Sequence, residues 1–217
     1  WGAGKPSRAV ALVGDSHAEH WRGALPRIAQ ARDWQGIEIF AGGCPATYAR
    51  SVMFERHPRD GDACPRWTTK VTATLRALAP DDIITSAYVQ PSVFEPANSG
   101  PAGFQKVWRE WLRFSRVTLL RDIPTTLGRS DPQCLSLNAG RPQACANPRS
   151  TALLDDDMMR AARPMRNEVN LVDLSDSFCD ATRCFAVIGG ASVYYDYDHM
   201  SNQFSGSMAS ALLSNLP

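Results

Sequence analysis

Short apolar runs alternate along this chain with longer segments in which apolar residues recur every three or four positions. The clearest helical segment, 66–78, places Trp67, Val71, Leu75 and Leu78 on one face. Strands alternating with helices of this length are typical of an α/β fold with a largely parallel sheet. The pattern predicts strands over 9–13, 37–40, 83–88, 117–120 and 169–174, helices over 17–34, 66–78, 104–114, 150–162 and 203–213, and irregular segments over 48–62, 90–103 and 125–149.

Composition limits both the size of the fold and the class of partner. With 217 residues, the chain is expected to form one domain over 1–217. A net charge of +1, without a Lys/Arg stripe, argues against nucleic-acid binding. No apolar run approaches the roughly 18 residues that a membrane span needs. The first residues lack both a signal-peptide layout and an initiator methionine, so we expect a domain excised from a longer protein.

The six cysteines fall into three close pairs, Cys44/Cys64, Cys134/Cys145 and Cys179/Cys184. Six cysteines permit many connectivities, and the sequence alone does not choose among them. Each pair brackets a loop-like segment, so local pairing is the simplest hypothesis, with free buried thiols as the alternative. Disulfides would favour an oxidising compartment.

A sharp turn ends the first predicted strand, where Gly14 is followed by Asp15 and Ser16. The serine lies at the start of the next helix, where the positive end of the helix dipole stabilises developing negative charge. That position suits a nucleophile. Because Asp and Ser are also good helix N-caps, the turn alone does not distinguish the two roles.

A serine nucleophile needs a base and a third group that orients the base. The chain has four histidines. His57 lies in a polar stretch and is interpreted as a solvated loop residue. His17 adjoins Ser16, but neighbouring helical residues point in different directions, so direct activation is not expected.

His199 follows Asp196 by three residues, in an acidic and aromatic turn before the last helix. In such a turn the carboxylate can hold Nδ1 of the imidazole and leave Nε2 for a serine. Asp198 competes with Asp196 for this role, with a turn or capping carboxylate as its alternative interpretation. Taken alone, Asp-x-x-His is also compatible with a surface capping turn.

Two further binding motifs carry less weight. His17 and His20, with Asp15, resemble part of a metal site, but the spacing lacks the longer H-E-x-x-H pattern, so we expect no metal. Trp108 and Trp111 might form a sugar-stacking platform. Their helical spacing favours core packing instead.

The Gly-Asp-Ser turn at 14–16 and the Asp-x-x-His turn at 196–199 together resemble the SGNH (GDSL-like) hydrolase superfamily. Within this superfamily, the chain most resembles the C-terminal SGNH domain of bacterial acyltransferase-3 proteins, which O-acylate cell-surface glycans. The segments that carry this closer resemblance are 14–18, 43–45, 179–184 and 195–201. The resemblance covers essentially the whole chain. It implies a three-layer α/β/α sandwich with a mainly parallel five-stranded sheet, the flavodoxin-like SGNH fold.

The same resemblance implies a role for each candidate residue. Ser16 would be the nucleophile, His199 the general base and acid, and Asp196 the orienting carboxylate. The backbone N–H groups of Ser16 and Gly43 would hold the oxyanion, although a plain tight turn accounts equally well for Gly43. The superfamily's Gly-x-Asn block, which supplies another oxyanion donor, is missing, because the third predicted strand ends Thr-Ser-Ala-Tyr at 85–88.

We therefore expect a serine-dependent O-acyltransferase domain that moves an acyl group, most simply acetyl, onto a cell-surface carbohydrate hydroxyl. A carbohydrate O-acetylesterase and a non-catalytic glycan-binding domain are the alternatives. The resemblance implies no cofactor in this domain, an acyl donor such as acetyl-CoA for the full-length protein, and a membrane acyltransferase-3 domain as partner. It also implies an extracytoplasmic, membrane-tethered and monomeric domain.

Overall fold

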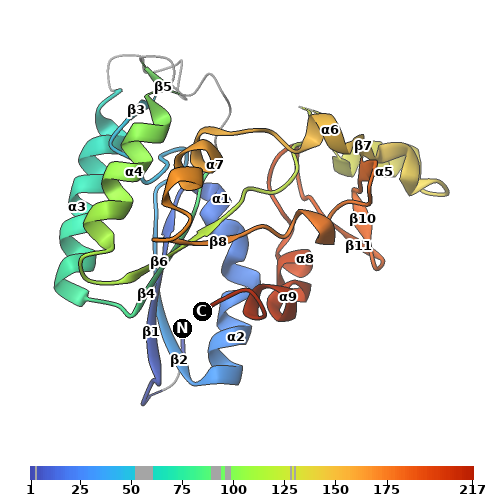
Figure 1. Ribbon diagram of the computed structural model, residues 1–217. Helices are drawn as coiled ribbons and strands as arrows, with labels where there is room; N and C mark the ends of the chain where they lie inside the picture. The colour runs from blue at the N-terminus through green and yellow to red at the C-terminus, as the bar shows by residue number, and fades with distance from the viewer. Residues whose placement is uncertain (3, 52–60, 89–93, 96–98, 128, 130) are drawn as a thin grey trace.

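A five-stranded sheet lies at the centre of the computed structural model, which describes residues 1–217 except 3, 52–60, 89–93, 96–98, 128 and 130 (Figure 1). The strand order is β2-β1-β4-β6-β8, and every pairing in this sheet is parallel. The predicted α/β fold is therefore confirmed. The strands are β1 (Arg8–Gly14), β2 (Trp34–Phe40), β4 (Asp82–Ser86), β6 (Arg116–Leu120) and β8 (Asn170–Val172).

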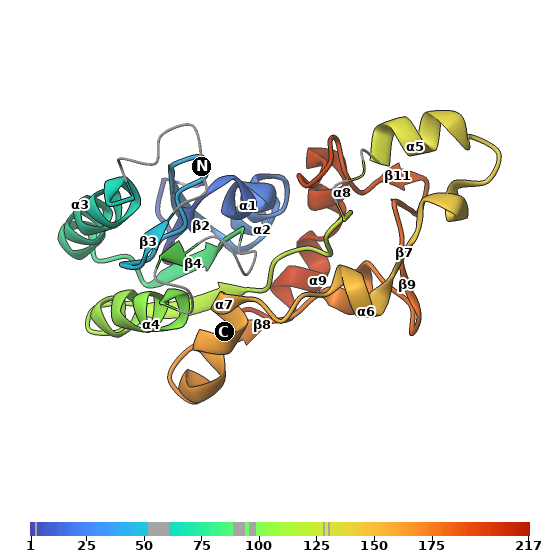
Figure 2. The same cartoon turned by 90° about the horizontal axis from the view of Figure 1, so that it is seen from above.

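Helices cover both faces of the sheet and complete three layers (Figures 1 and 2). One face carries α1 (Ser16–Glu19), α2 (Leu25–Arg32), α8 (Asn202–Ser207) and α9 (Ala209–Leu213); the other carries α3 (Ala63–Leu78), α4 (Gly100–Trp111) and α7 (Asp157–Ala162). Alternate residues of β1 enter two separate hydrophobic clusters, Leu12 on the first face and Val13 on the second. Trp108 and Trp111 are fully buried in the second cluster, which confirms that they belong to the core.

The helix predicted over 17–34, with an interruption at Pro26, is observed as three shorter helices: α1, the 3₁₀ helix η1 (His20–Gly23) and α2. A Cβ atom on Gly23 would lie 2.5 Å from the backbone oxygen of Asn202, so η1 and α8 are in close contact at this break. Pro26 lies in the first turn of α2, where its missing N–H is tolerated. Asp33, with φ of +55°, ends α2, and the chain enters β2 at Trp34.

The insert over 125–149 is more ordered than predicted, and it lies away from the central sheet in both views (Figures 1 and 2). It contains α5 (Asp131–Leu137), η3 (Pro142–Cys145) and β7 (Asn147–Pro148). The predicted helix over 150–162 is two short helices, α6 (Arg149–Ala152) and α7, because Asp156 caps a new N-terminus. The remaining elements are β3 (Arg50–Ser51), β5 (Phe94–Glu95), η4 (Arg163–Met165), η5 (Ser175–Ser177), β9 (Arg183–Cys184), β10 (Val187–Ile188) and β11 (Ala191–Ser192).

Two smaller boundaries also differ from the prediction. The irregular segment expected over 90–103 ends earlier, because α4 begins at Gly100. The last helix is divided at Met208 into α8 and α9. Within the described ranges, no helix is both long enough and apolar enough to cross a lipid bilayer.

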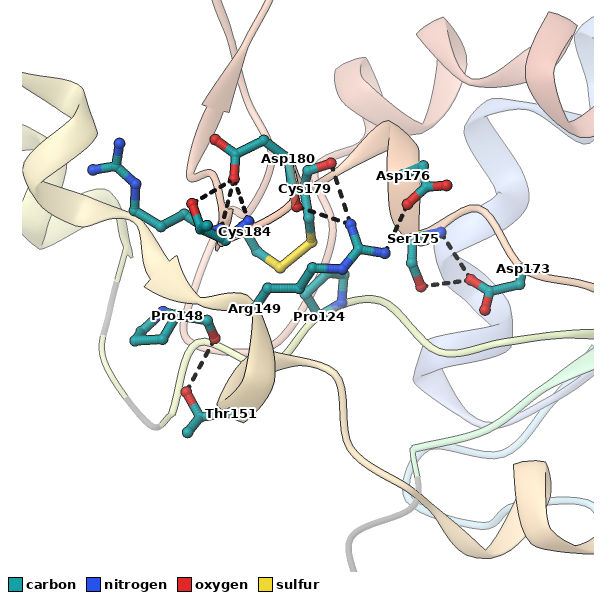
Figure 3. The surroundings of a disulfide bond; sticks show 12 residues. Pro124, Pro148, Arg149, Thr151, Asp173, Ser175, Asp176, Cys179, Asp180 and Cys184 are labelled. Atoms are coloured by element: carbon teal, nitrogen blue, oxygen red, sulfur yellow. Dashed lines mark hydrogen bonds and ion pairs between the residues drawn. A yellow bond between two sulfur atoms is a disulfide. The ribbon is translucent and has the colours of Figure 1, made fainter.

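The three predicted disulfides are confirmed as Cys44–Cys64, Cys134–Cys145 and Cys179–Cys184. Arg149 lies beside the last of them (Figure 3). Its guanidinium donates to the backbone oxygen of Asp180 at 2.9 Å and to the carboxylate of Asp176 at 2.7 Å. These hydrogen bonds connect α6 to the segment between β8 and β9.

Candidate active site

Ser16 is positioned by the end of β1. Gly14 pairs with Phe40 of β2 on one side and Ser86 of β4 on the other, so β1 ends between two neighbouring strands. Gly14 has φ of +153°, and a Cβ there would lie 2.5 Å from the Ser86 backbone oxygen. Only glycine fits this turn, which brings Ser16 to the first position of α1 at the carboxyl edge of the sheet.

Asp15, next to Ser16, is a buried structural residue. One carboxylate oxygen accepts from the backbone N–H of His17 at 2.9 Å, which caps α1. The other accepts from the backbone N–H of Tyr88 at 2.9 Å and joins the end of β4 to the turn. Burial raises the pKa of Asp15 despite these hydrogen bonds.

His199 lies in the loop between β11 and α8, which is anchored on both sides. Tyr194 and Met200 form an antiparallel bridge at the base of the loop. The Ser201 hydroxyl donates to the backbone oxygen of Ser192 at 2.5 Å and caps α8 by accepting from the Phe204 N–H. The chain therefore holds this loop in one place over the end of β1.

The structure brings together the three side chains selected from the sequence. Nε2 of His199 lies 2.9 Å from the Ser16 hydroxyl, and Nδ1 lies 2.8 Å from Oδ2 of Asp196. Oδ1 of Asp196 also accepts from the backbone N–H groups of Asp198 and His199 at 3.0 and 2.7 Å. A continuous hydrogen-bonded chain thus runs from a carboxylate through an imidazole to a hydroxyl.

Asp198 approaches the same imidazole nitrogen. Its Oδ1 lies 2.8 Å from Nδ1 of His199, as close as the oxygen of Asp196. Only Asp196 meets the directional requirement of a hydrogen bond, and Oδ1 of Asp198 is buried without a hydrogen-bond partner in the described part of the chain. Asp196 is therefore the group that orients the ring.

The two carboxyl groups differ electrostatically. Burial acts to raise the pKa of Asp196, but hydrogen bonds from the backbone N–H groups of Asp198 and His199, and from the His199 ring, hold it below its ordinary value. Burial raises the pKa of Asp198, with only partial opposition from His199 and His17. Asp196 is the more stable anion of the pair.

The His17 ring makes its hydrogen bond to Asp122, whereas the Ser16 hydroxyl is paired with His199. Nδ1 of His17 lies 2.7 Å from Oδ1 of Asp122, which follows β6. Burial opposes a charge on His17, but Asp122, with smaller contributions from Asp15 and Asp198, raises the pKa of the imidazole. Sequence reasoning missed Asp122 and Tyr88 as site residues; their position just after the ends of β6 and β4 was the available signal.

His20 completes a group of three imidazoles beside Ser16. Its ring centroid lies 4.3 Å from that of His17 and 5.6 Å from that of His199. Burial, and then the two neighbouring imidazoles, lower the pKa of His20 well below its ordinary value. Asp15, considered with His17 and His20 from the sequence, instead binds backbone N–H groups.

An open cleft of about 520 Å³ gives access to these groups, and Ser16, His20 and His199 line it. The Tyr195 ring stacks on the His199 ring at a centroid distance of 5.5 Å and remains 60% exposed. Arg22 also lines the cleft. The cleft therefore offers aromatic and charged surface to a polar substrate.

Gly43 lies in the turn after β2, where the Cys44 N–H donates to the backbone oxygen of Ala41 at 2.9 Å. The Ala41 N–H in turn donates to the backbone oxygen of Gly14 at 3.1 Å, so this turn adjoins the end of β1. The role predicted for the Gly43 N–H stays a prediction. His57 lies outside the described residues.

Comparison with known proteins bears on the family and the fold of this chain. The family model described as the SGNH domain fused to AT3 domains matches residues 2–214. Among solved structures, the periplasmic domain of a lipopolysaccharide acetyltransferase from Salmonella ser. Paratyphi A has a TM-score of 0.70 and 10% sequence identity, covering 95% of this chain and 84% of that chain. This likeness confirms the predicted fold. No curated protein matches the chain.

Proposed function

Because the chain belongs to the family of SGNH domains fused to AT3 domains, we propose that it transfers an acyl group to a carbohydrate hydroxyl through an acyl-serine intermediate. The observation that carries this proposal is the hydrogen-bonded chain from Asp196 through His199 to Ser16. It pairs a nucleophile with a base, and the base with an orienting group, as covalent acyl transfer requires.

In the first step, Oγ of Ser16 attacks the carbonyl carbon of an acyl donor while Nε2 of His199 accepts the hydroxyl proton. Asp196 accepts a hydrogen bond from Nδ1–H, which fixes the tautomer that leaves Nε2 free. The donor's leaving group then takes the proton from His199, and the acyl-serine remains. A sugar hydroxyl attacks it in the second step, with His199 again accepting and returning the proton.

The oxyanion formed in each step needs hydrogen-bond donors. We assign this role to the backbone N–H groups of Ser16 and Gly43, which follow the ends of β1 and β2. Thr85 to Tyr88 supply no asparagine where the superfamily has its Gly-x-Asn block. Since one oxyanion donor is worth about 10²–10³ in kcat, we expect a slow isolated domain.

The donor and acceptor follow from the family and from the cleft. The acyl group, most simply acetyl, would come from a donor such as acetyl-CoA by way of the membrane AT3 domain, and the acceptor would be a cell-surface glycan. The exposed Tyr195 ring offers a flat apolar face beside His199. The three disulfides favour an oxidising, extracytoplasmic location. The family further suggests a monomeric domain that its AT3 partner tethers to the membrane.

The proposal is tested by labelling and by product partition. The wild-type domain is treated with a fluorophosphonate or with p-nitrophenyl acetate, and the modified residue is identified by peptide mass spectrometry. We expect modification at Ser16, its loss in Ser16→Ala, and its retention in Ser214→Ala, which removes an exposed hydroxyl of the last turn. Adding an acceptor oligosaccharide should then divert product from free acetate to acetylated sugar.

Two outcomes would contradict different parts of the proposal. A wild-type domain that neither reagent modifies would reject the acyl-serine and favour a non-catalytic glycan-binding role. An acetylated Ser16 whose acetate release is unchanged by the sugar, with no sugar modified, would reject transfer and favour an esterase.

A further inference from the structure

The buried imidazole of His20 makes no hydrogen bond to any of the described residues. The residue is only 6% exposed, and neither ring nitrogen has a hydrogen-bond partner among them. Buried polar atoms in native proteins are normally paired with protein or with a bound species. A neutral imidazole with both nitrogens unpartnered therefore points to a ligand.

The neighbours of His20 are two more imidazoles. One ring nitrogen from each of His17, His20 and His199 lies within 4.8 Å of the other two. His17 and His20 are three residues apart in the chain, whereas His199 arrives from the loop before α8. Three imidazoles that converge from two segments are the ligand set of Zn²⁺ and related divalent transition metals.

Carboxylates beside two of these histidines support the same interpretation. Nδ1 of His17 is held by Asp122 at 2.7 Å, and Nδ1 of His199 is held by Asp196 at 2.8 Å. Carboxylates that hold one nitrogen of a histidine and leave the other for a metal are a recurring feature of zinc sites. In both histidines the nitrogen that no carboxylate holds is Nε2, and in His199 this nitrogen lies 2.9 Å from the Ser16 hydroxyl.

We propose that His17, His20 and His199 form a site for a divalent transition metal such as Zn²⁺, and that its occupation excludes catalysis at Ser16. Nε2 of His199, which accepts the hydroxyl proton in the proposed mechanism, would be a metal ligand instead. A nitrogen lone pair bound to a metal cannot accept a proton. The cleft lined by Ser16, His20 and His199 gives the ion a path from solvent.

Metal binding is tested first, without reference to activity. Metal-free, oxidised wild-type domain is titrated with ZnCl₂ at neutral pH by calorimetry, in a buffer that does not chelate. We expect one ion per chain, binding weakened at least about 100-fold in His20→Ala, and weakened roughly 10–100-fold in Asp122→Asn, which changes the carboxylate that holds His17 and leaves all three imidazoles in place. His57→Ala, which removes the one histidine outside the site, should bind as the wild type does.

Circular dichroism and thermal melts check that each variant is folded, and His20→Gln repeats the test with a polar side chain retained. No zinc binding by the wild type, or equal binding by folded His20→Ala and His20→Gln, would overturn the site.

The exclusion of catalysis rests on the proposed function and is measured separately. At free Zn²⁺ about 100 times its Kd, only about 1% of the wild-type chains remain metal-free, so fluorophosphonate labelling of Ser16 should fall about 100-fold and recover with EDTA. In His20→Ala, the rate of Ser16 labelling should be nearly the same with and without zinc. Zinc that binds without slowing wild-type labelling would overturn the exclusion but leave the site. Absence of labelling in metal-free wild type would reject the proposed function, while the calorimetric result would stand.

Discussion

Two carboxylates lie at equal distance from one imidazole nitrogen in this site, so hydrogen-bond direction decides between them. Asp196 and Asp198 are each 2.8 Å from Nδ1 of His199. Asp196 makes the directed bond and also accepts two backbone N–H groups of its own turn. It therefore orients the ring and is itself oriented by the turn, whereas Asp198 contributes only its charge.

This difference predicts unequal effects of two isosteric changes. Asp196→Asn should lower kcat for acetyl-ester hydrolysis, and the rate of Ser16 labelling, by roughly 10³–10⁴-fold, because an amide donor favours the wrong His199 tautomer. Asp198→Asn should lower the same two rates by a factor at least about ten times smaller. Equal losses in the two variants, or a larger loss for Asp198→Asn, would reverse the assignment.

The helix α7 shows how an element boundary depends on one buried group. Asp156 caps this helix by accepting from the Met159 N–H at 2.7 Å. It also lines a small cavity of about 30 Å³ together with His17, Asp122 and Asp198. Burial, with Asp122 nearby, raises the pKa of Asp156 from 3.8 to about 7 despite the capping bond and Arg121.

This raised pKa predicts a pH-dependent stability. In the folded state Asp156 keeps its proton up to about pH 7, whereas in the unfolded state it loses it near 3.8. The free energy of unfolding should therefore fall as pH rises through that window. The difference corresponds to on the order of 4 kcal/mol.

Asp156→Asn removes this contribution and still caps the helix. We expect the stability of wild type relative to Asp156→Asn, from urea unfolding, to decrease between about pH 4 and 8. Asp155→Asn, at the exposed neighbouring position, should follow the wild-type curve. Parallel curves for wild type and Asp156→Asn would contradict the prediction.

At the scale of the whole molecule, one central sheet lies between two hydrophobic clusters, and each cluster packs against one of its faces. Leu12 of β1 lies in the first cluster and Leu119 of β6 in the second, and both are fully buried. Neither cluster can lose its packing without exposing a face of the same five strands. We therefore expect residues 1–217 to unfold as one cooperative domain.

A matched pair of variants tests this cooperativity. Leu12→Ala and Leu119→Ala should each lower the Tm of a single transition by roughly 4–20 °C, since each costs about 2–5 kcal/mol in a chain of this size. Far-UV and near-UV circular dichroism, recorded with the disulfides oxidised, should report the same midpoint. Two transitions, of which each variant shifts only one, would indicate two domains.

Features that depend on neighbouring residues were predictable from the sequence. The Gly-Asp-Ser pattern at 14–16 can be recognised locally, and the turn that joins Asp196 to His199 and the three local disulfides rest on short-range geometry. Strand–helix alternation likewise predicted the parallel sheet, because each strand must be followed by a crossover before the next parallel strand. The resemblance to SGNH domains, now confirmed over residues 2–214, followed from these same local motifs.

Contacts between distant segments decided the features that the sequence did not predict. The bond between Ser16 and His199 spans 183 positions, and that between His17 and Asp122 spans 105. α8 lies close against the helix break at Gly23, and the third imidazole beside His17 and His20 arrives from the far end of the chain. By itself the sequence determined which side chains can act. Only the tertiary structure decided which of them meet, because the strand order of the sheet sets the position of every loop at its carboxyl edge.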